Sequence, residues 1–535
     1  MLAAGMLAVA CADYNDLDGF AAEADPSVKT PYSDLSAVKS YIDKDKYPNM
    51  TLGTQLKVSD FNKQELAHAA AVTNFNNYAF GTTLMSGTIV NEKGVMNFLS
   101  MKELLDHVQE IGGEVYGSPL FANANQADSW LNYLTAPIEI PVDFVEGKSV
   151  DFNEMNEGDK YNEGTIVKYD DQNCLKITGG GKVRIISDFE VDPTATYTTT
   201  FYARVDKEQS YNIYFSGEKV DGTGADGKWV LKPGKWTKVV VESKSAPDAT
   251  DGYLRIENLR GTAIYIQKVQ VGYYPDNHRP QTEQELKDTI MYAVNTWCDG
   301  VMKVNEGRVK LFDLIEEAID TKAEMESGYY DIKHSTEKIF WQDVLGSEQY
   351  GPVVSKTASA KFQDYGGDPS ALKFFISENG LEEDKKFESL KHWMKVWEDN
   401  GAKIDGINAK LSLVYDEAKT VDENMSDFVR MLDNLAGTGK LIRLSNFDIK
   451  YQDADGVSVT ATKITEEQRQ KLADYNKAVI QTYMNKIPNE RQAGICKGNM
   501  VDTTDPVGLW AIDSSTKDWV RNAIYKAFCD ALSGK

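Results

Sequence analysis

Two adjacent carboxylates stand at the end of a short apolar stretch, where Glu316 and Glu317 follow residues 311–315. Paired carboxyl groups can act as general acid and general base when their environments separate their pKa values. Neighbouring residues at a strand end point to opposite sides, so only one of the two can face a shared site. We expect Glu317 to line that site and Glu316 to meet a helix.

Residue types suited to metal and thiol chemistry are sparse. The chain has five histidines, and none forms a ligand pair by its spacing: His68, His107, His278, His334 and His392. The cysteines beyond the N-terminal segment show no CxxC pattern, which disfavours a zinc site or a redox dithiol: Cys174, Cys298, Cys496 and Cys529. We expect buried thiols, no metal and no cofactor. A structural calcium ion in the middle of the chain lacks support, because the acidic residues there match no EF-hand loop.

The charge of the chain limits its partners. Lysine and arginine number 58 and aspartate and glutamate 82, which gives a formal charge of −24. Such a chain repels phosphate backbones, and its lysines are interleaved with acids, so we expect no nucleic-acid partner. Hydrophobic residues make up 41% of the 535 residues, which is typical of globular domains. Beyond residue 12, no apolar run approaches the length needed to cross a bilayer.

The first residues have the composition of an export signal. Residues 1–10 are small and apolar and precede Cys11, which resembles the end of a bacterial lipoprotein signal. No lysine or arginine comes before Cys11, and a buried N-terminal helix is the alternative. The acidic stretch that follows is similar to the export tags of Bacteroidetes surface lipoproteins. We expect residues 1–30 to be a signal and linker, and Cys11 to carry a lipid that anchors an exported protein at the outer membrane or cell surface.

Two segments, 31–138 and 278–535, alternate helical and strand-like patterns. Apolar residues recur at helical spacing, and short apolar runs separate the helices. The predicted helices are 99–111, 284–303 and 385–399, and the predicted strands include 309–315, 372–375 and 404–407. Such alternation favours a parallel sheet, and over this length it predicts a (β/α)8 TIM barrel.

The segment between them, 139–277, has a different pattern. Gly and Asp turn signals recur about every ten residues, and the runs between them alternate polar and apolar residues. This predicts an antiparallel β-sandwich or jelly roll inserted into a surface loop of the barrel. Trp229 and Tyr214 lie near turns or on the exposed phase of strands, as do Tyr211 and Tyr253, and could form a binding platform. We expect Trp236 to pack in the sandwich core.

Four segments of the barrel resemble family 10 glycoside hydrolases, which are endo-β-1,4-xylanases on a TIM barrel. LFDLIEEAID (311–320) resembles the family's WDVVNEAxD, FWQDVLG (340–346) resembles FYQVLGE, IDGINAKLSL (404–413) resembles IDGIGMQSHL, and LIRLSNFDI (441–449) resembles the IRITELDI strand. The resemblance implies that Glu317 occupies the acid/base position and that Glu316 stands where an asparagine holds the substrate. The inserted β module also resembles the carbohydrate-binding modules that interrupt such barrels.

The chain departs from the family at the positions that carry the chemistry. Asn446 occupies the position of the nucleophile, and a neutral amide cannot form the usual glycosyl–enzyme ester. Asn123, Lys410 and Lys497 replace the family's cleft residues, as do Ser118, Ala122 and Ser412. Uncharged residues at 82–86 replace its ENEMK stretch. We expect these positions to line a remnant cleft in which Phe121, Trp130 and Trp510 supply rings for stacking, with Trp510 preferred.

These residues favour glycan binding without hydrolysis, with xylan or a related β-1,4-linked plant polysaccharide as the ligand that the resemblance implies. Two alternatives stay open. One is an active hydrolase in which Glu317 works with a displaced carboxylate such as Asp448 in an inverting mechanism. The other is a structural role beside other surface glycan-uptake proteins.

Overall fold

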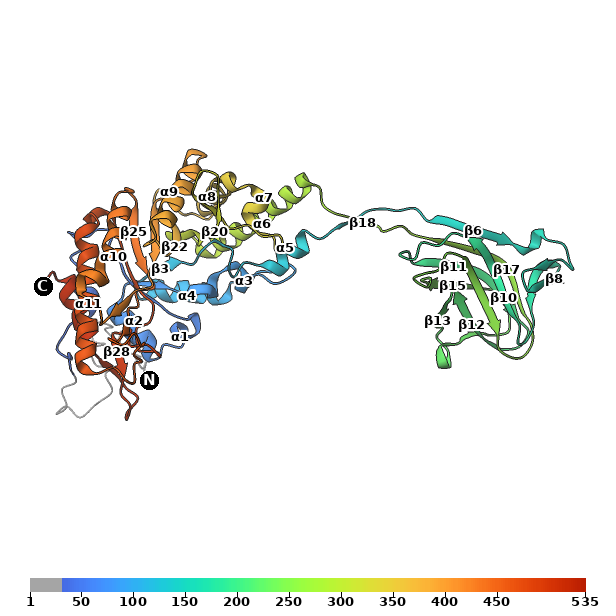
Figure 1. Ribbon diagram of the computed structural model, residues 1–535, viewed down its shortest axis with the longest axis horizontal. Helices are drawn as coiled ribbons and strands as arrows, with labels where there is room; N and C mark the ends of the chain where they lie inside the picture. Colours follow the sequence, from blue (N-terminus) through green and yellow to red (C-terminus); the bar gives the residue numbers. More distant parts are fainter. Residues whose placement is uncertain (1–30) are drawn as a thin grey trace, which may run out of the picture. The chain divides into compact units, whose positions relative to one another are not determined.

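The computed structural model describes residues 31–535, which form two compact units (Figure 1). The first unit contains the described residues up to Ala136 together with Thr282–Lys535, and the second contains Pro137–Gln281. The predicted signal and the anchor at Cys11 lie outside the described residues. No helix within residues 31–535 combines the length and the apolar character that a membrane crossing requires.

The first unit is a closed parallel barrel. Eight strands in the described part of the chain pair in ring order: β22 (Lys373–Asn379), β23 (Gly406–Lys410), β25 (Leu441–Ser445), β27 (Gln492–Lys497), β1 (Leu52–Gln55), β2 (Asn77–Ala79), β3 (Glu114–Gly117) and β19 (Leu311–Glu316). Strand β19 pairs with β22 and closes the ring, and β4 (Phe121–Ala122) pairs with β19 beyond β3. The predicted TIM barrel is confirmed.

Amphipathic helices cover the outside of the barrel. They are α1 (Val58–Asn62), α2 (Leu66–Asn74), α3 (Ser86–Ile89), α4 (Leu99–Glu110), α5 (Asp128–Leu134), α6 (Glu283–Asn305), α7 (Trp341–Leu345), α8 (Ser347–Asp364), α9 (Asp384–Asp399), α10 (Val421–Ala436), α11 (Glu466–Lys486) and α12 (Ala523–Leu532). Capping boxes at Thr282, Thr420 and Thr465 satisfy the first amides of α6, α10 and α11. The four cysteines at 174, 298, 496 and 529 are buried free thiols, as expected.

Short strand pairs decorate the connections of the barrel. They are β20 (Ile319–Glu324) with β21 (Tyr330–Ile332), β24 (Val414–Asp416) with β26 (Lys450–Gln452), and β28 (Trp510–Ile512) with β29 (Trp519–Arg521). Inside the barrel, Tyr116, Phe375 and Ala493 form one apolar layer. Gly406 lies against Phe375, since a Cβ at this position would come 2.2 Å from the ring. Glycine therefore lets a large side chain fill the narrow interior.

The second unit consists of two antiparallel sheets around their own core. The five-stranded sheet contains β10 (Lys182–Phe189), β16 (Gly252–Asn258), β12 (Gln209–Phe215), β13 (Glu218–Val220) and β14 (Trp229–Leu231). The seven-stranded sheet contains β15 (Thr237–Ser243), β11 (Tyr197–Val205), β17 (Ile264–Tyr273), β9 (Gln172–Ile177), β8 (Gly164–Tyr169), β7 (Lys160–Tyr161) and β6 (Val145–Asp151). A two-stranded ladder joins β5 (Ile138–Glu139) to β18 (His278–Arg279), so the chain enters and leaves this unit side by side.

Candidate functional site at the barrel mouth

The carboxyl ends of the barrel strands bring the predicted polar residues to one mouth. Glu317 follows β19, Lys410 ends β23 and Asn446 follows β25. Glu317 and Asn446 both have left-handed backbone conformations, with φ of 47° and 51°. The Glu317 amide donates to the Ser377 carbonyl at 2.8 Å, which helps to hold this conformation. Such backbone conformations are costly for residues with a Cβ and cluster at functional sites.

Lys410 joins the two glutamates into one cluster. Its ammonium lies 2.9 Å from a carboxylate oxygen of Glu316 and 2.6 Å from one of Glu317. The expectation that Glu316 turns away towards a helix is therefore wrong. Strict alternation applies to extended backbone, and the left-handed turn at Glu317 brings the two side chains to the same cation.

The cluster sets the charge state of Glu317. Burial alone would raise the pKa of this carboxyl, but hydrogen bonding and charge from Lys410, with help from Lys333 and Asn379, outweigh burial and lower it. Burial lowers the pKa of the Lys410 ammonium, but Glu316 and Glu317 raise this pKa by more, so the net shift is upward. Glu317 is therefore ionised near neutral pH. A general acid needs the opposite, a pKa raised towards the working pH.

Asp448 is engaged in a structural role near Asn446. Its carboxylate pairs with the ammonium of Lys497 and accepts hydrogen bonds from the side-chain amide of Asn499 at 2.6 Å and its backbone amide at 3.1 Å. Lys497 is 0% exposed and also donates to the Phe447 carbonyl at 2.7 Å. The expectation that Lys497 binds substrate is wrong, because its charge is buried as the counter-ion of Asp448.

A cavity of about 700 Å³ opens at the mouth beside Asn446 and Asp448. Its wall is mostly polar or aliphatic and includes Thr82, Ser412 and Asn499. Trp519, at the start of β29, is the tryptophan that lines it, and the sequence analysis overlooked this residue. The signal was available, because Trp519 directly follows the polar residues 513–518, whose composition is typical of a turn.

The rings predicted for this cleft lie in the core instead. Phe121 is 1% exposed and packs edge-on against Trp341, and Trp510 is 6% exposed between Trp519 and Tyr525. Trp130 is buried as well. These rings fill space between barrel strands and helices, so they offer no face to a sugar. Asn123 is half-buried and accepts a hydrogen bond from Gln342 at 3.1 Å.

Below the mouth, the barrel interior contains a buried acid. Asp313 accepts a hydrogen bond from the Tyr116 hydroxyl at 2.6 Å and another from the Asn408 amide at 3.0 Å. Burial raises the pKa of Asp313 to about 7, against the lowering effect of these hydrogen bonds. Arg443 lies over the Tyr116 ring at 3.8 Å. This network belongs to the inner layers of the barrel and does not line the mouth cavity.

In the second unit, the structure differs from the predicted binding platform and from the predicted core position of Trp236. Trp229 is half-buried against the core, and its indole N–H donates to the Val220 carbonyl at 2.9 Å, while Arg255 covers the Tyr214 ring at 4.6 Å. Both rings are thus engaged within the unit. Tyr211, expected on an exposed phase, is buried. Trp236, expected in the core, is instead half-exposed and contacts Tyr169.

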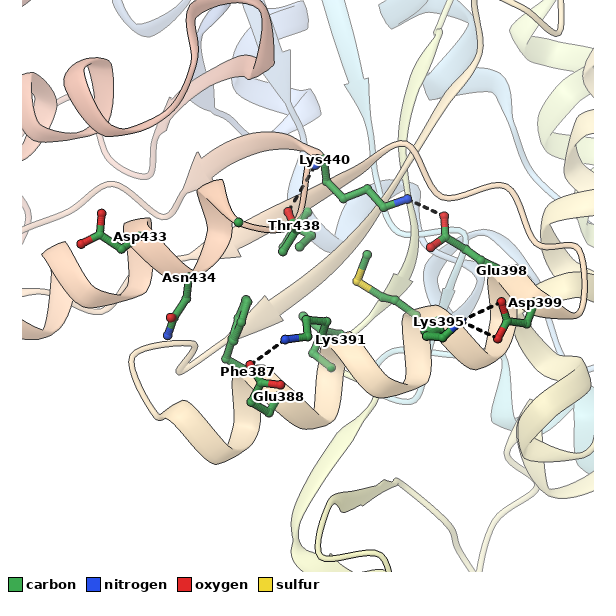
Figure 2. A pocket seen from close by; sticks show the side chains of 14 residues that line it. Phe387, Glu388, Lys391, Lys395, Glu398, Asp399, Asp433, Asn434, Thr438 and Lys440 are labelled. Carbon is green, nitrogen blue, oxygen red and sulfur yellow. Dashed lines mark hydrogen bonds and ion pairs between the residues drawn. The ribbon is translucent and has the colours of Figure 1, made fainter.

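A cavity of about 560 Å³ lies outside the barrel between α9 and α10 (Figure 2). Its charged rim is paired: Lys391 with Glu388 at 2.8 Å, Lys395 with Asp399 at 2.9 Å, and Lys440 with Glu398. The rim groups therefore neutralise one another, and the cavity is remote from the strand ends that carry Glu317 and Asn446.

The described residues contain no group of three or more metal-ligating side chains. The histidines do include one pair, however, since the Nε2 atoms of His68 and His107 lie 3.2 Å apart across α2 and α4. This contact arises from the packing of α2 against α4, so sequence spacing could not indicate it.

The closed parallel barrel defines a TIM-barrel protein with a glutamate cluster at the carboxyl ends of its strands. Residues 272–507 match the family described as glycosyl hydrolase family 10. A comparison with curated protein sequences finds no match.

Solved xylanase structures share the fold at low identity. The endo-1,4-β-xylanase XylE of Penicillium canescens is 11% identical with a TM-score of 0.51, covering 94% of this chain and 98% of its own. Xylanase B of Clostridium stercorarium F9 is 9% identical with a TM-score of 0.51, covering 93% and 100%. A family 10 endoxylanase from a sugarcane soil metagenome is 9% identical with a TM-score of 0.52, covering 93% and 100%. At these identities the likeness concerns the fold alone.

Proposed function

We propose that the barrel binds a neutral β-1,4-linked polysaccharide of the xylan class and does not hydrolyse it. The family match and the xylanase names of the similar structures support the ligand class. One observation carries the absence of hydrolysis. The site combines a neutral residue, Asn446, at the nucleophile position with a glutamate, Glu317, that Lys410 keeps ionised. Retaining hydrolysis needs both a nucleophile and a protonated acid.

An inverting hydrolase is the rival, and the site disfavours it. Such a mechanism needs one protonated carboxyl and one free carboxylate that activates water. Lys410 keeps Glu317 charged, and Lys497 and Asn499 occupy Asp448. These contacts support the binding proposal over an inverting mechanism.

The ligand on this proposal occupies the mouth cavity, whose size suits a short stretch of a sugar chain. Trp519 supplies the ring, and Asn446, Ser412 and Asn499 supply polar groups. We further propose that the protein is exported and held at the cell surface by a lipid on Cys11, where it retains polysaccharide for neighbouring uptake proteins.

Two assays on one purified sample test the proposal: retention on soluble and insoluble xylan, and release of reducing sugar. Binding without product release is expected, and Trp519→Ala should weaken the binding at least about tenfold, equivalent to 1.4 kcal/mol. Steady product release that Glu317→Gln abolishes would overturn the proposal. Failure of xylan and of other neutral β-linked glycans to bind would overturn it as well.

A further inference from the structure

The outer surface of the seven-stranded sheet carries an unusual group of aromatic side chains. We call it the aromatic face: Tyr169, Tyr202, Arg204, Trp236 and Tyr265. Along β11, alternate residues are buried in the core, so Tyr202 and Arg204 point outward on the same side. Tyr202 is 39% exposed, a high fraction for a large ring on a sheet surface.

Strand register brings the rest of the group together. Arg204 is paired with Tyr265 on β17. The register of β11 with β15 pairs Ala203 with Thr237, and one further step sets Trp236 opposite Arg204 and diagonal to Tyr202. Tyr169, at the tip of the β8–β9 hairpin, lies 4.2 Å from the Tyr265 ring and 6.2 Å from the Trp236 ring, centroid to centroid.

The charged groups of the aromatic face are compensated. Arg204 lies 5.1 Å from the Tyr169 ring and pairs with Asp170. The Tyr169 hydroxyl donates to the carboxylate of Asp206. Exposed Lys238, which pairs with Tyr202 across β11 and β15, is a cation beside these rings for which no ion pair is seen in the described residues. The surface therefore offers mainly rings and hydrogen-bonding groups, which suits a polyhydroxylated ligand.

The outer surface of the five-stranded sheet differs, because its rings are already covered. Arg184 lies over Tyr253 at 4.3 Å and Arg255 over Tyr214 at 4.6 Å. Each arginine also pairs with a carboxylate, Asp251 or Glu257. In the described part of the chain, no ring or cation–π contact of this kind covers Tyr202.

We propose that the aromatic face is a second glycan site, which binds a neutral β-linked polysaccharide chain across Tyr202 and Trp236. Ring faces carry partial negative charge and attract the partially positive C–H groups of a sugar. Arg204 pairs with Tyr265 on β17, and Gln267 follows two residues later on that strand, so both are placed to supply polar contacts. The ligand class rests on the proposed function, but the site does not depend on the barrel. A stable protein partner would need a broader apolar patch than these few rings provide.

Full-length variants test the assignment by electrophoresis through gels that contain soluble arabinoxylan, mixed-linkage β-glucan or polygalacturonate. Tyr202→Ala and Trp236→Ala are the test variants, Tyr214→Ala is the matched control on the other sheet, and Trp519→Ala reports on the barrel. Melting curves verify folding, and Trp236→Phe should retain most of the affinity because it keeps a ring.

In a Trp519→Ala background, Trp236→Ala or Tyr202→Ala should weaken the remaining binding to a neutral glycan at least about tenfold. Tyr214→Ala should leave it unchanged. If Trp519→Ala alone abolishes binding, or if Tyr214→Ala weakens it while the test variants do not, the second site is refuted and the barrel proposal stands. If the test variants alone abolish binding, the barrel proposal fails and this one stands. Absence of binding to both neutral glycans, or selective binding of polygalacturonate, refutes the second site.

Discussion

At the scale of single residues, Lys410 sets the charge state of Glu317 at the barrel mouth. Its ammonium holds Glu316 and Glu317 within 2.9 Å and keeps Glu317 ionised. On the proposed function, a neutral residue at the nucleophile position removes one step of retaining hydrolysis, and an ionised acid removes the other. The proposal thus assigns two independent defects to this site, and repair of one should not suffice.

The first prediction follows from these two defects. Asn446→Glu places a carboxylate at the position that the resemblance assigns to the nucleophile but leaves Lys410 on Glu317. Ser412 and Asn123 would still stand in place of the family's cleft residues. We expect reducing-sugar release from xylan to stay at the level of the blank. Steady turnover by this single variant would show that the remaining cleft is catalytically competent.

The second prediction concerns pH. Lys410→Met removes the cation from two half-buried carboxylates and should cost about 1–3 kcal/mol of unfolding free energy at pH 7. The Glu317 pKa is depressed in the folded protein, so this stabilisation is present above the unfolded pKa and is lost as the pH falls through the folded value. The difference in melting temperature between wild type and variant should therefore be full at pH 7 and shrink below about pH 4.

Lys450→Met is the control for this pH series. Lys450 pairs with Asp505 at 2.9 Å, but its side chain is more than half exposed. A surface ion pair contributes about 1 kcal/mol or less, so this variant should melt close to wild type at every pH. An equal loss of stability in both variants would mean that the Lys410 cluster has no special electrostatic role.

At the scale of elements, the barrel strands position the cluster by filling the interior tightly. Gly406→Ala in β23 would set a Cβ 2.2 Å from the Phe375 ring and 2.8 Å from the Leu441 carbonyl, and the strand that carries Lys410 must then shift. We expect a loss of about 1–3 kcal/mol in chemical denaturation. Gly437→Ala is the control. Gly437 ends α10 in a right-handed helical conformation, so this change alters only the entropy of the unfolded chain and should be neutral or slightly stabilising.

The element pattern was the part of the structure that the sequence could predict. The alternation of helical and strand-like patterns predicted the barrel, because apolar residues recur every three to four positions in a helix and every second position in a strand. The burial of Phe121, Trp510 and Lys497 could not be predicted in this way. Whether a ring faces a cleft or the core depends on the neighbouring helix and hairpin. The left-handed conformation of Glu317 breaks the strand alternation from which we predicted that Glu316 and Glu317 point to opposite sides.

At the scale of the whole molecule, the two units have separate cores that share no residue. We expect calorimetry to show two unfolding transitions and not one. Phe201→Ala, in the core of the all-β unit, should lower one transition through a loss of about 3–5 kcal/mol. The other transition should stay within error of wild type, and equal shifts in both would contradict separate cores.

The pairing of β5 with β18 suggests how the all-β unit can be deleted from the chain. Arg279 pairs with Ile138, so the points where the chain enters and leaves the all-β unit are neighbours. A short Gly–Ser linker in place of Pro137–Gln281 should therefore let the barrel close without strain, because a short loop between adjacent ends costs little entropy. On the two-site proposal, this deletion variant keeps the barrel transition and the Trp519-dependent binding, and loses the binding that depends on Trp236.

Two weak sites on one chain raise the effective ligand concentration at each other. The full-length protein should therefore bind long polysaccharide chains more tightly than the deletion variant does. For oligosaccharides too short to span both sites, the two proteins should have equal affinity. Equal affinities for long chains would show that the two units do not act together.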